Sequence, residues 1–171
     1  MDLRRVWWLV GCAFPLAGLM GFADPVKISA PAFAEGQPIP ALYAKAQNVS
    51  PKLRMGNVPS NARSLALIVD DPDSPSGLWT HWLVWNLPPG TTEIPEGKLP
   101  PDALQGKNSF GNVRYDGPAP PSGTHRYFFH LYALDASLVL PAGSDRATLE
   151  AAMKGHLVSE GQTFGIYSAS P

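Results

Sequence analysis

The chain has 171 residues, of which 44% are apolar and 16% are charged, and its formal net charge is −1. This length predicts about one domain, and the near-neutral charge gives no reason to expect nucleic acid or an anionic membrane as a partner. The 19 prolines and 16 glycines are spread along the chain, which favours many short strands joined by turns over a helical bundle.

Residues 1–23 predict a secretory signal peptide. A short basic start precedes an apolar stretch, and residues 21–23 (Gly-Phe-Ala) form a small-x-small cleavage pattern. Three alternatives stay open: a retained membrane anchor, a lipid-modified Cys12, and a twin-arginine signal. We expect a periplasmic or secreted protein whose mature part, residues 24–171, contains no cysteine and therefore no disulfide.

The first predicted strands lie before residue 70. Apolar and polar residues alternate at positions 26–28, which indicates a short strand. Residues 48–53 indicate a turn that leads into another strand. Residues 64–69 (Ser-Leu-Ala-Leu-Ile-Val) form a continuous apolar run rich in branched side chains. This run predicts a strand that is buried on both faces.

A rigid acidic turn follows this strand. Residues 70–77 contain three aspartates and two prolines, and proline both removes a backbone donor and restricts the residue before it. The aromatic and β-branched residues 79–86 then predict a second strand. With a period of two, His81 is expected to share a face with Leu83 and Trp85.

A second block of the chain is built in the same way. Residues 87–107 predict a long exposed loop, and residues 117–123 form a proline-rich turn between two glycines. Residues 124–134 then predict an aromatic strand that begins at His125, with Tyr127 on the same face. We infer that the two blocks lie side by side around one cavity, formed by Asp71, Asp73, His81, His125, Tyr127, Pro120 and Pro121.

Only the end of the chain predicts a substantial helix. Ser144 is the expected N-cap of a helix over residues 144–158, and residues 162–168 can form a final strand. No repeat or linker divides the sequence. The predicted fold class is therefore mainly β in a single domain.

Two regions of the sequence resemble the signatures of the phosphatidylethanolamine-binding protein family, and in particular its bacterial branch of Raf-kinase-inhibitor-like proteins. One is residues 71–75 (Asp-Pro-Asp-Ser-Pro) followed by His81 and Trp82, and the other is residues 115–127. The resemblance implies two antiparallel β-sheets of Greek-key type with a few peripheral helices. It also implies a small anion pocket, and because bacterial relatives often look dimeric it leaves a homodimer open. Carried over residue by residue, the pocket comprises Asp71, Asp73, Pro75, Trp79, His81, Gly117, Pro120, Pro121, His125 and Tyr127.

The chemistry of these residues fits a weak, pH-sensitive site for phosphate or a phospholipid head group such as phosphoethanolamine. A carboxylate that accepts a hydrogen bond from one ring nitrogen of His81 or His125 leaves the other nitrogen facing the phosphate. Backbone N–H groups near Gly117 and Gly123 are expected to add neutral donors. An ethanolamine ammonium would meet a carboxylate or an aromatic face.

Other interpretations of these residues stay open. A buried Asp–His pair that only stabilises a turn would explain Asp71 and His81, whereas His130 and His156 are expected to be packing or surface residues. Two histidines and two aspartates could bind zinc in a metal-dependent hydrolase. The mature sequence contains no recognised catalytic motif, so we expect a binding protein without a cofactor or metal and not an enzyme. The resemblance also leaves open a protein partner, such as a serine protease that the pocket rim would inhibit.

Overall fold

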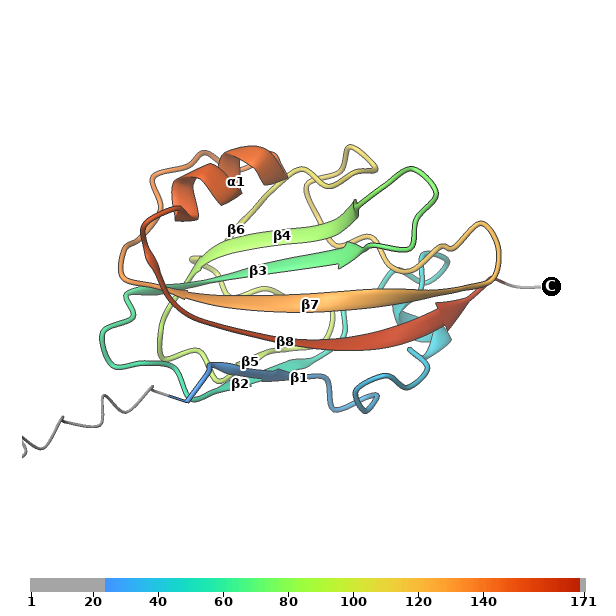
Figure 1. Ribbon diagram of the computed structural model, residues 1–171, viewed down its shortest axis with the longest axis horizontal. Coiled ribbons are helices and arrows are strands. Elements are labelled where there is room, and N and C mark those ends of the chain that lie inside the picture. The colour runs from blue at the N-terminus through green and yellow to red at the C-terminus, as the bar shows by residue number, and fades with distance from the viewer. Residues whose placement is uncertain (1–23, 170–171) are drawn as a thin grey trace, which may run out of the picture.

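The computed structural model describes residues 24–169 of the chain (Figure 1). Among these residues, no helix is long and apolar enough to cross a membrane. Besides one turn of 3-10 helix at Ala41–Tyr43, the elements in chain order are β1 (Lys27–Ser29), β2 (Leu53–Gly56), β3 (Ser64–Asp71), β4 (Trp79–Leu87), β5 (Glu93–Ile94), β6 (Leu104–Gln105), β7 (Thr124–Leu134), α1 (Arg146–Met153) and β8 (Leu157–Ser168).

The strands form two antiparallel sheets, which confirms the predicted fold class. One sheet has the order β1-β2-β5, and the other has the order β6-β4-β3-β7-β8. The larger core lies between the sheets, and a smaller core lies between the five-stranded sheet and α1. The five-stranded sheet is therefore the middle layer, with α1 on one face and the small sheet on the other (Figure 1).

The layer arrangement explains why β3 is buried along its whole length. Leu65, Leu67 and Val69 pack in the core between the sheets, whereas Ala66 and Ile68 pack against the layer that contains α1. A strand covered on both faces needs apolar residues at every position, and the run at residues 64–69 supplies them. This prediction is confirmed.

A β-bulge in β4 contradicts the predicted face of His81. Val69 pairs with Trp82, but the next residue, Asp70, pairs with Thr80, so His81 is an extra residue in β4. The bulge shifts the alternation of side chains by one position. His81 therefore points toward the core between the sheets, on the side of Trp82, and not toward the α1 side with Leu83 and Trp85.

Two further boundaries differ from the prediction. The helix is shorter than expected because Asp145, not Ser144, is its N-cap and accepts a hydrogen bond from the N–H of Thr148 at 2.9 Å. It ends before Gly155, whose φ of 86° favours glycine, and β8 then begins at Leu157. The predicted loop over residues 87–107 contains β5 and β6, and Ile94 of β5 is fully buried.

The outer edge of β8 is covered by the beginning of the described chain. Residues 36–39 run beside it, with hydrogen bonds from Gly36 N to Phe164 O and from Ile39 N to Ile166 O, both at 2.8 Å. Farther along, the carbonyl oxygen of Val26 lies 1.9 Å from the position that a Cβ on Gly161 would occupy, so this contact requires glycine. The N-terminal segment thus protects an edge strand that would otherwise be exposed.

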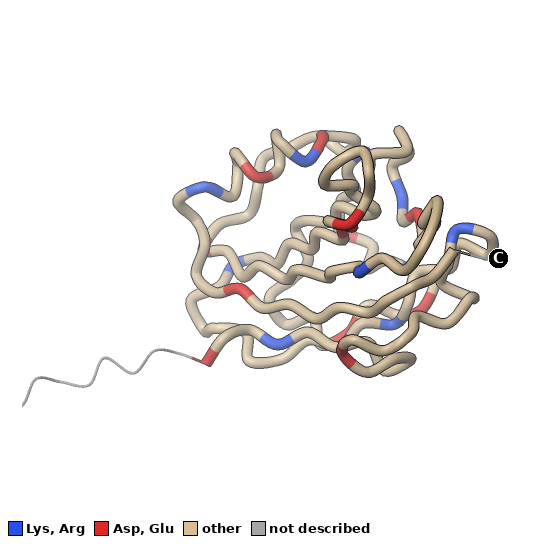
Figure 2. The backbone as a smooth tube through the Cα atoms, turned by 45° about the vertical axis from the view of Figure 1, so that its right-hand side comes forward, with Lys and Arg blue, Asp and Glu red and all other residues tan. Residues whose placement is uncertain are grey.

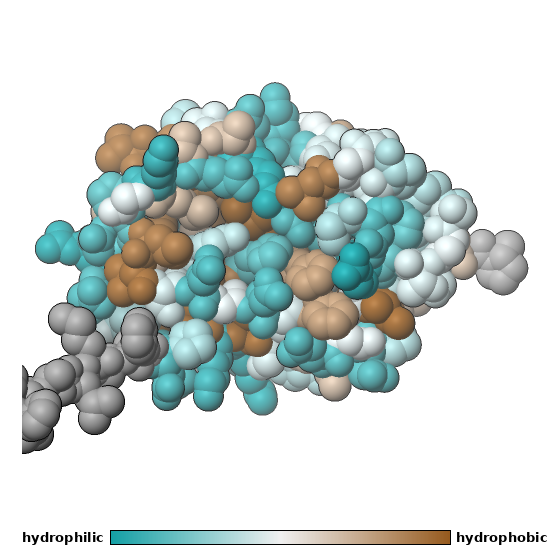
Figure 3. Space-filling model, in the orientation of Figure 1, coloured by the Kyte–Doolittle hydropathy of each residue, from teal (hydrophilic) through white to brown (hydrophobic). Residues whose placement is uncertain are grey.

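The surface of the described chain is mixed in character. In the view of Figure 2, Lys and Arg are interspersed with Asp and Glu and do not gather into regions of one sign. The face shown in Figure 3 is largely hydrophilic, and its coloured apolar residues form small separate groups. Scattered apolar groups of this kind are ordinary for a protein surface.

Candidate functional site

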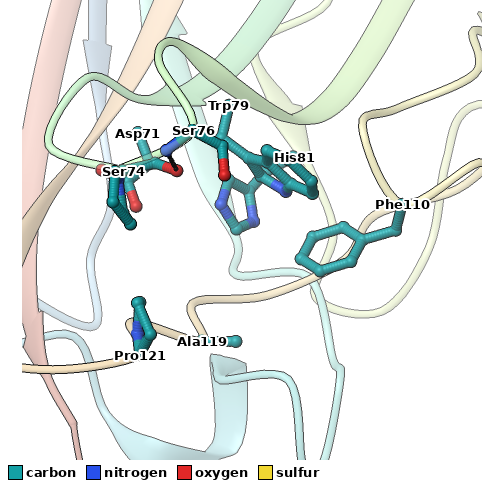
Figure 4. Close-up of a pocket in the computed structure, with 9 residues that line it drawn as sticks. Asp71, Ser74, Ser76, Trp79, His81, Phe110, Ala119 and Pro121 are labelled. Carbon is teal, nitrogen blue, oxygen red and sulfur yellow. Dashed lines mark hydrogen bonds between the residues drawn. The ribbon is translucent and has the colours of Figure 1, made fainter.

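A small pocket lies where the β3–β4 turn meets the proline-rich turn before β7. Its volume is about 160 Å³, below the range typical of sites for drug-sized ligands, so it suits a small group. The rings of His81 and Phe110 point into the space between the two turns (Figure 4). The lining residues are Asp71, Ser74, Pro75, Ser76, Trp79, His81, Phe110, Ala119 and Pro121.

Asp71 ends β3 at the pocket wall, and both of its carboxylate oxygens are engaged. Oδ1 accepts a hydrogen bond from the N–H of Asp73 at 2.8 Å, and Oδ2 lies 2.7 Å from Nδ1 of His125 on β7. Both side chains are buried, so this pair joins the two turns below the pocket floor. With Nδ1 committed to the carboxylate, Nε2 is the ring nitrogen of His125 that stays available.

His81 occupies the bulge of β4 and is 2% exposed. Its Nδ1 donates a hydrogen bond to the backbone carbonyl of Asp116 at 2.6 Å, which leaves Nε2 as an acceptor in the neutral ring. The ring also makes edge contacts with Tyr127 and Phe110, at centroid distances of 5.1 and 5.5 Å. Burial lowers the pKa of His81, because it disfavours the charged imidazolium.

A buried network holds the carbonyl that orients His81. The Asp116 side chain has no exposed area and accepts hydrogen bonds from Lys45 at 2.5 Å, Asn48 at 3.2 Å, Asn108 at 2.8 Å and Asn112 at 2.7 Å. Burial by itself would raise the pKa of Asp116, but these hydrogen bonds lower it to about 2. The carboxylate is therefore ionised and fully paired.

Lys45 connects this network to the pocket rim. Its ammonium group lies 3.8 Å from the centroid of the Phe110 ring, a cation–π distance, while it pairs with Asp116. Phe110 in turn packs edge-on against Trp79 at 5.4 Å. The Lys45 ammonium group thus holds Phe110, and through it Trp79, in place at the pocket.

The structure brings five of the ten predicted site residues into the lining: Asp71, Pro75, Trp79, His81 and Pro121. His125 and Tyr127 lie directly behind them, through their contacts with Asp71 and His81. The Tyr127 hydroxyl is buried without a hydrogen-bond partner among the described residues, and burial together with the Asp71 carboxylate raises its pKa.

The other three predicted residues, Asp73, Gly117 and Pro120, do not line the pocket. Both carboxylate oxygens of Asp73 bind the Arg126 guanidinium, at 2.6 and 2.8 Å, and these hydrogen bonds lower the pKa of Asp73 to about 2. The N–H of Gly117 donates to the side chain of Asn48 at 2.8 Å and is not free for a ligand. Asp73 and Gly117 therefore position the two turns.

The sequence pattern does not predict Phe110, Ser76, Ser74 or Ala119 as site residues. Phe110 lies in a loop without periodicity. The other two histidines are paired with carboxylates elsewhere: His130 with Asp70 at 3.3 Å and His156 with Asp135 at 2.8 Å. Within residues 24–169, no three His, Cys, Asp or Glu side chains are grouped as a metal site would require.

Comparison with known proteins agrees with this geometry. The profile of the family described as phosphatidylethanolamine-binding protein matches residues 29–168, which is most of the described chain. The chain belongs to this family. The phosphatidylethanolamine-binding protein fold thus accounts for the two sheets and for the convergence of the two turns.

Similar members of the phosphatidylethanolamine-binding protein family come from bacteria and archaea. A UPF0098 protein from Methanothermobacter thermautotrophicus is 46% identical over 142 residues, 80% of this chain and 94% of that protein. The crystal structure of a homologue from Chlamydia trachomatis is 38% identical with a TM-score of 0.82, covering 86% of this chain and 99% of that one. The structure of E. coli YbcL is 26% identical with a TM-score of 0.80, covering 85% and 99%.

Proposed function

We propose that this family member is an exported, non-catalytic binding protein whose pocket receives a small anion, either phosphate or a phosphoethanolamine-type head group. The observation that carries the proposal is that a buried His81, whose Nδ1–H is held by the Asp116 carbonyl, lines a pocket of about 160 Å³ whose one carboxylate, Asp71, is already engaged. Export rests on the signal peptide predicted at residues 1–23, which lies outside the described residues; N-terminal sequencing of the secreted protein would test it.

The protonation of His81 decides which anions the pocket accepts. In the neutral ring, Nδ1–H is held by the Asp116 carbonyl, so Nε2 presents a lone pair to the ligand. A fully ionised anion would meet this lone pair unfavourably. Binding therefore requires one proton, which comes either from solvent onto Nε2 or from a ligand that carries a P–OH group.

The pH dependence of anion affinity follows from this requirement. Free His81 has a lowered pKa, and a bound anion raises it, because negative charge favours the imidazolium. Affinity is then greatest below the pKa of the free state and falls as pH rises from that pKa to the pKa of the bound state. For sulfate, which does not titrate between about pH 5 and 8, we expect a loss of up to about tenfold per pH unit between these two pKa values. Titration calorimetry at several pH values measures it.

The His81→Gln variant provides the test of this mechanism. It keeps a polar side chain but cannot gain a proton, so its sulfate affinity should be weaker by about tenfold at low pH and independent of pH. His156→Gln is the matched control, because His156 is exposed and pairs with Asp135 outside the pocket. Equal pH profiles for the wild type and His81→Gln would contradict the proposal.

A protein partner at the pocket rim is the second candidate function. Phe110 lines the pocket and is 36% exposed, and an exposed apolar side chain at a cleft suits a protein contact. A serine protease is the partner class that we carry forward. The wild type should inhibit a trypsin-like or chymotrypsin-like protease in a peptide-hydrolysis assay, and Phe110→Ser should not; inhibition by neither protein removes this candidate.

A further inference from the structure

A second cavity, of about 420 Å³, lies on the other side of the segment that contains Tyr115 and Asp116. The bulge of β4 separates the two cavities, since His81 lines the first and the next residue, Trp82, lines the second. The volume of the second cavity falls within the range of sites for small organic molecules. The lining residues are Asn48, Ser50, Trp82, Gly97, Lys98, Leu99, Gln105, Arg114 and Tyr115.

The charges of this cavity are the reverse of those in the first pocket. Lys98 and Arg114 line it and no carboxylate does, whereas the first pocket contains Asp71 and neither Lys nor Arg. Lys98 forms no ion pair within residues 24–169, and Arg114 reaches Asp116 only at 3.6 Å. Because Asp116 is fully buried and shared with Lys45, its charge does not cancel both cations. The second cavity therefore offers uncompensated positive charge.

The uncharged polar groups add a donor on the same wall. The indole N–H of Trp82 donates to Oε1 of Gln105 at 2.8 Å, which fixes the orientation of the amide and leaves its NH₂ group as a donor. The amide of the Asn48 side chain already forms hydrogen bonds with Tyr115 O, Asp116 and Gly117, so Asn48 lines the cavity without binding the ligand. Trp82 and Tyr115, in edge contact at 5.5 Å, provide apolar surface.

Backbone hydrogen bonds fix the loop that carries Lys98. The N–H of Gly97 donates to Ser50 O at 2.9 Å, and the N–H of Lys98 donates to Pro95 O at 3.2 Å. Gly97 has a φ of 63°, which favours glycine at this turn. The cavity is thus formed before any ligand arrives, and a preformed site loses less entropy on binding.

We infer that this second cavity binds a small organic anion, namely a phosphate or carboxylate group joined to a flat apolar portion. The anionic group contacts Lys98 and Arg114 and accepts a hydrogen bond from the Gln105 amide. The flat portion packs against Trp82 and Leu99. This site is separate from the proposed phosphate pocket and does not use His81.

The two cavities can be observed separately by NMR, because a different tryptophan lines each one. Phenyl phosphate is titrated into the isotope-labelled protein while the indole N–H signals of Trp82 and Trp79 are followed. We expect saturable shifts of the Trp82 indole and of the Gln105 side-chain NH₂. Phenol, the neutral counterpart, should not produce them. Increasing salt should weaken the affinity, because both cations are exposed to solvent.

Charge-removing variants complete the test. Lys98→Gln and Arg114→Gln should each weaken the affinity reported by Trp82 by about three- to tenfold, whereas Lys154→Gln, an equal charge change on an exposed residue of another surface, should not. In His81→Gln the Trp82 shift should persist even if the Trp79 shift is lost. An absent Trp82 shift, an unchanged affinity in both cavity variants, or loss of the Trp82 shift in His81→Gln would overturn the inference; the last result would leave the phosphate pocket standing.

Discussion

Asp116→Ala is expected to lower the free energy of unfolding by about 3–5 kcal/mol, because it removes the shared acceptor of a buried network. Lys45 would keep a partly buried positive charge without its partner, and the amides of Asn48, Asn108 and Asn112 would lose an acceptor. Urea unfolding followed by circular dichroism measures the change. Asp116→Asn keeps the volume and one acceptor oxygen, so its loss should be smaller, about 2–3 kcal/mol.

The pH dependence of stability distinguishes the loss of the Asp116 charge from the change in the shape of its side chain. The lowered pKa of Asp116 means that the folded state binds the proton more weakly than the unfolded state does. Its contribution to stability is therefore complete above its ordinary pKa and is lost as pH falls toward about 2. The wild type and Asp116→Asn should thus converge in stability in that range. Asp102→Ala, an exposed control, should change stability by less than about 0.5 kcal/mol; a similar small value for Asp116→Ala would contradict the network.

Gly117→Ala is expected to destabilise the protein by at least about 3 kcal/mol, for a steric reason. An added Cβ would lie 2.1 Å from the carbonyl oxygen of Tyr43 and 2.7 Å from the carbonyl carbon of Ala44. Both are backbone atoms, which cannot rotate away as a flexible side chain can. The clash would also strain the hydrogen bond from Gly117 N to Asn48. Thermal unfolding should show a decrease in Tm of about 6–12 °C for this loss.

Gly56→Ala is the matched control for this effect. Gly56 ends β2, and a Cβ added there would meet no atom within 4 Å. Its φ also lies outside the left-handed region, so alanine should be neutral or stabilise by up to about 1 kcal/mol. Equal Tm values for the two variants would show that residues 43–44 can move aside, and the structural role given to Gly117 would be wrong.

The elements that could be predicted from the sequence are those with strong local signals. The apolar run of β3 and the two turns stiffened by proline were correctly placed, because burial and proline geometry act over a few residues. The family followed from the same two turns. The faces of β7 were also correct, since His125, Tyr127 and Phe129 alternate with exposed or half-buried residues.

The parts that could not be predicted depend on pairing between distant segments. The bulge at His81 is visible only once β3 and β4 are in register, because residues 82–85 are apolar on both faces and show no period that an insertion would break. The Asp73–Arg126 pair depends on the exact conformation of the two turns, and the packing of Gly117 depends on the distant residues 43–44. Phe110 reaches the pocket because of the conformation of its loop, and this conformation could not be inferred from the amino-acid composition of the loop.

Residues 26–39 cover β8, and this arrangement affects the order in which the chain can fold. Residues 36–39 find their hydrogen-bond partners only when the last strand, β8, is made, so these native contacts join residues far apart in sequence. Topologies of this kind fold slowly. During synthesis, β7 has only β3 beside it until β8 leaves the ribosome. For a polypeptide that is exported as we propose, slow folding of this kind would favour a chain that is still unfolded when it reaches a translocation channel.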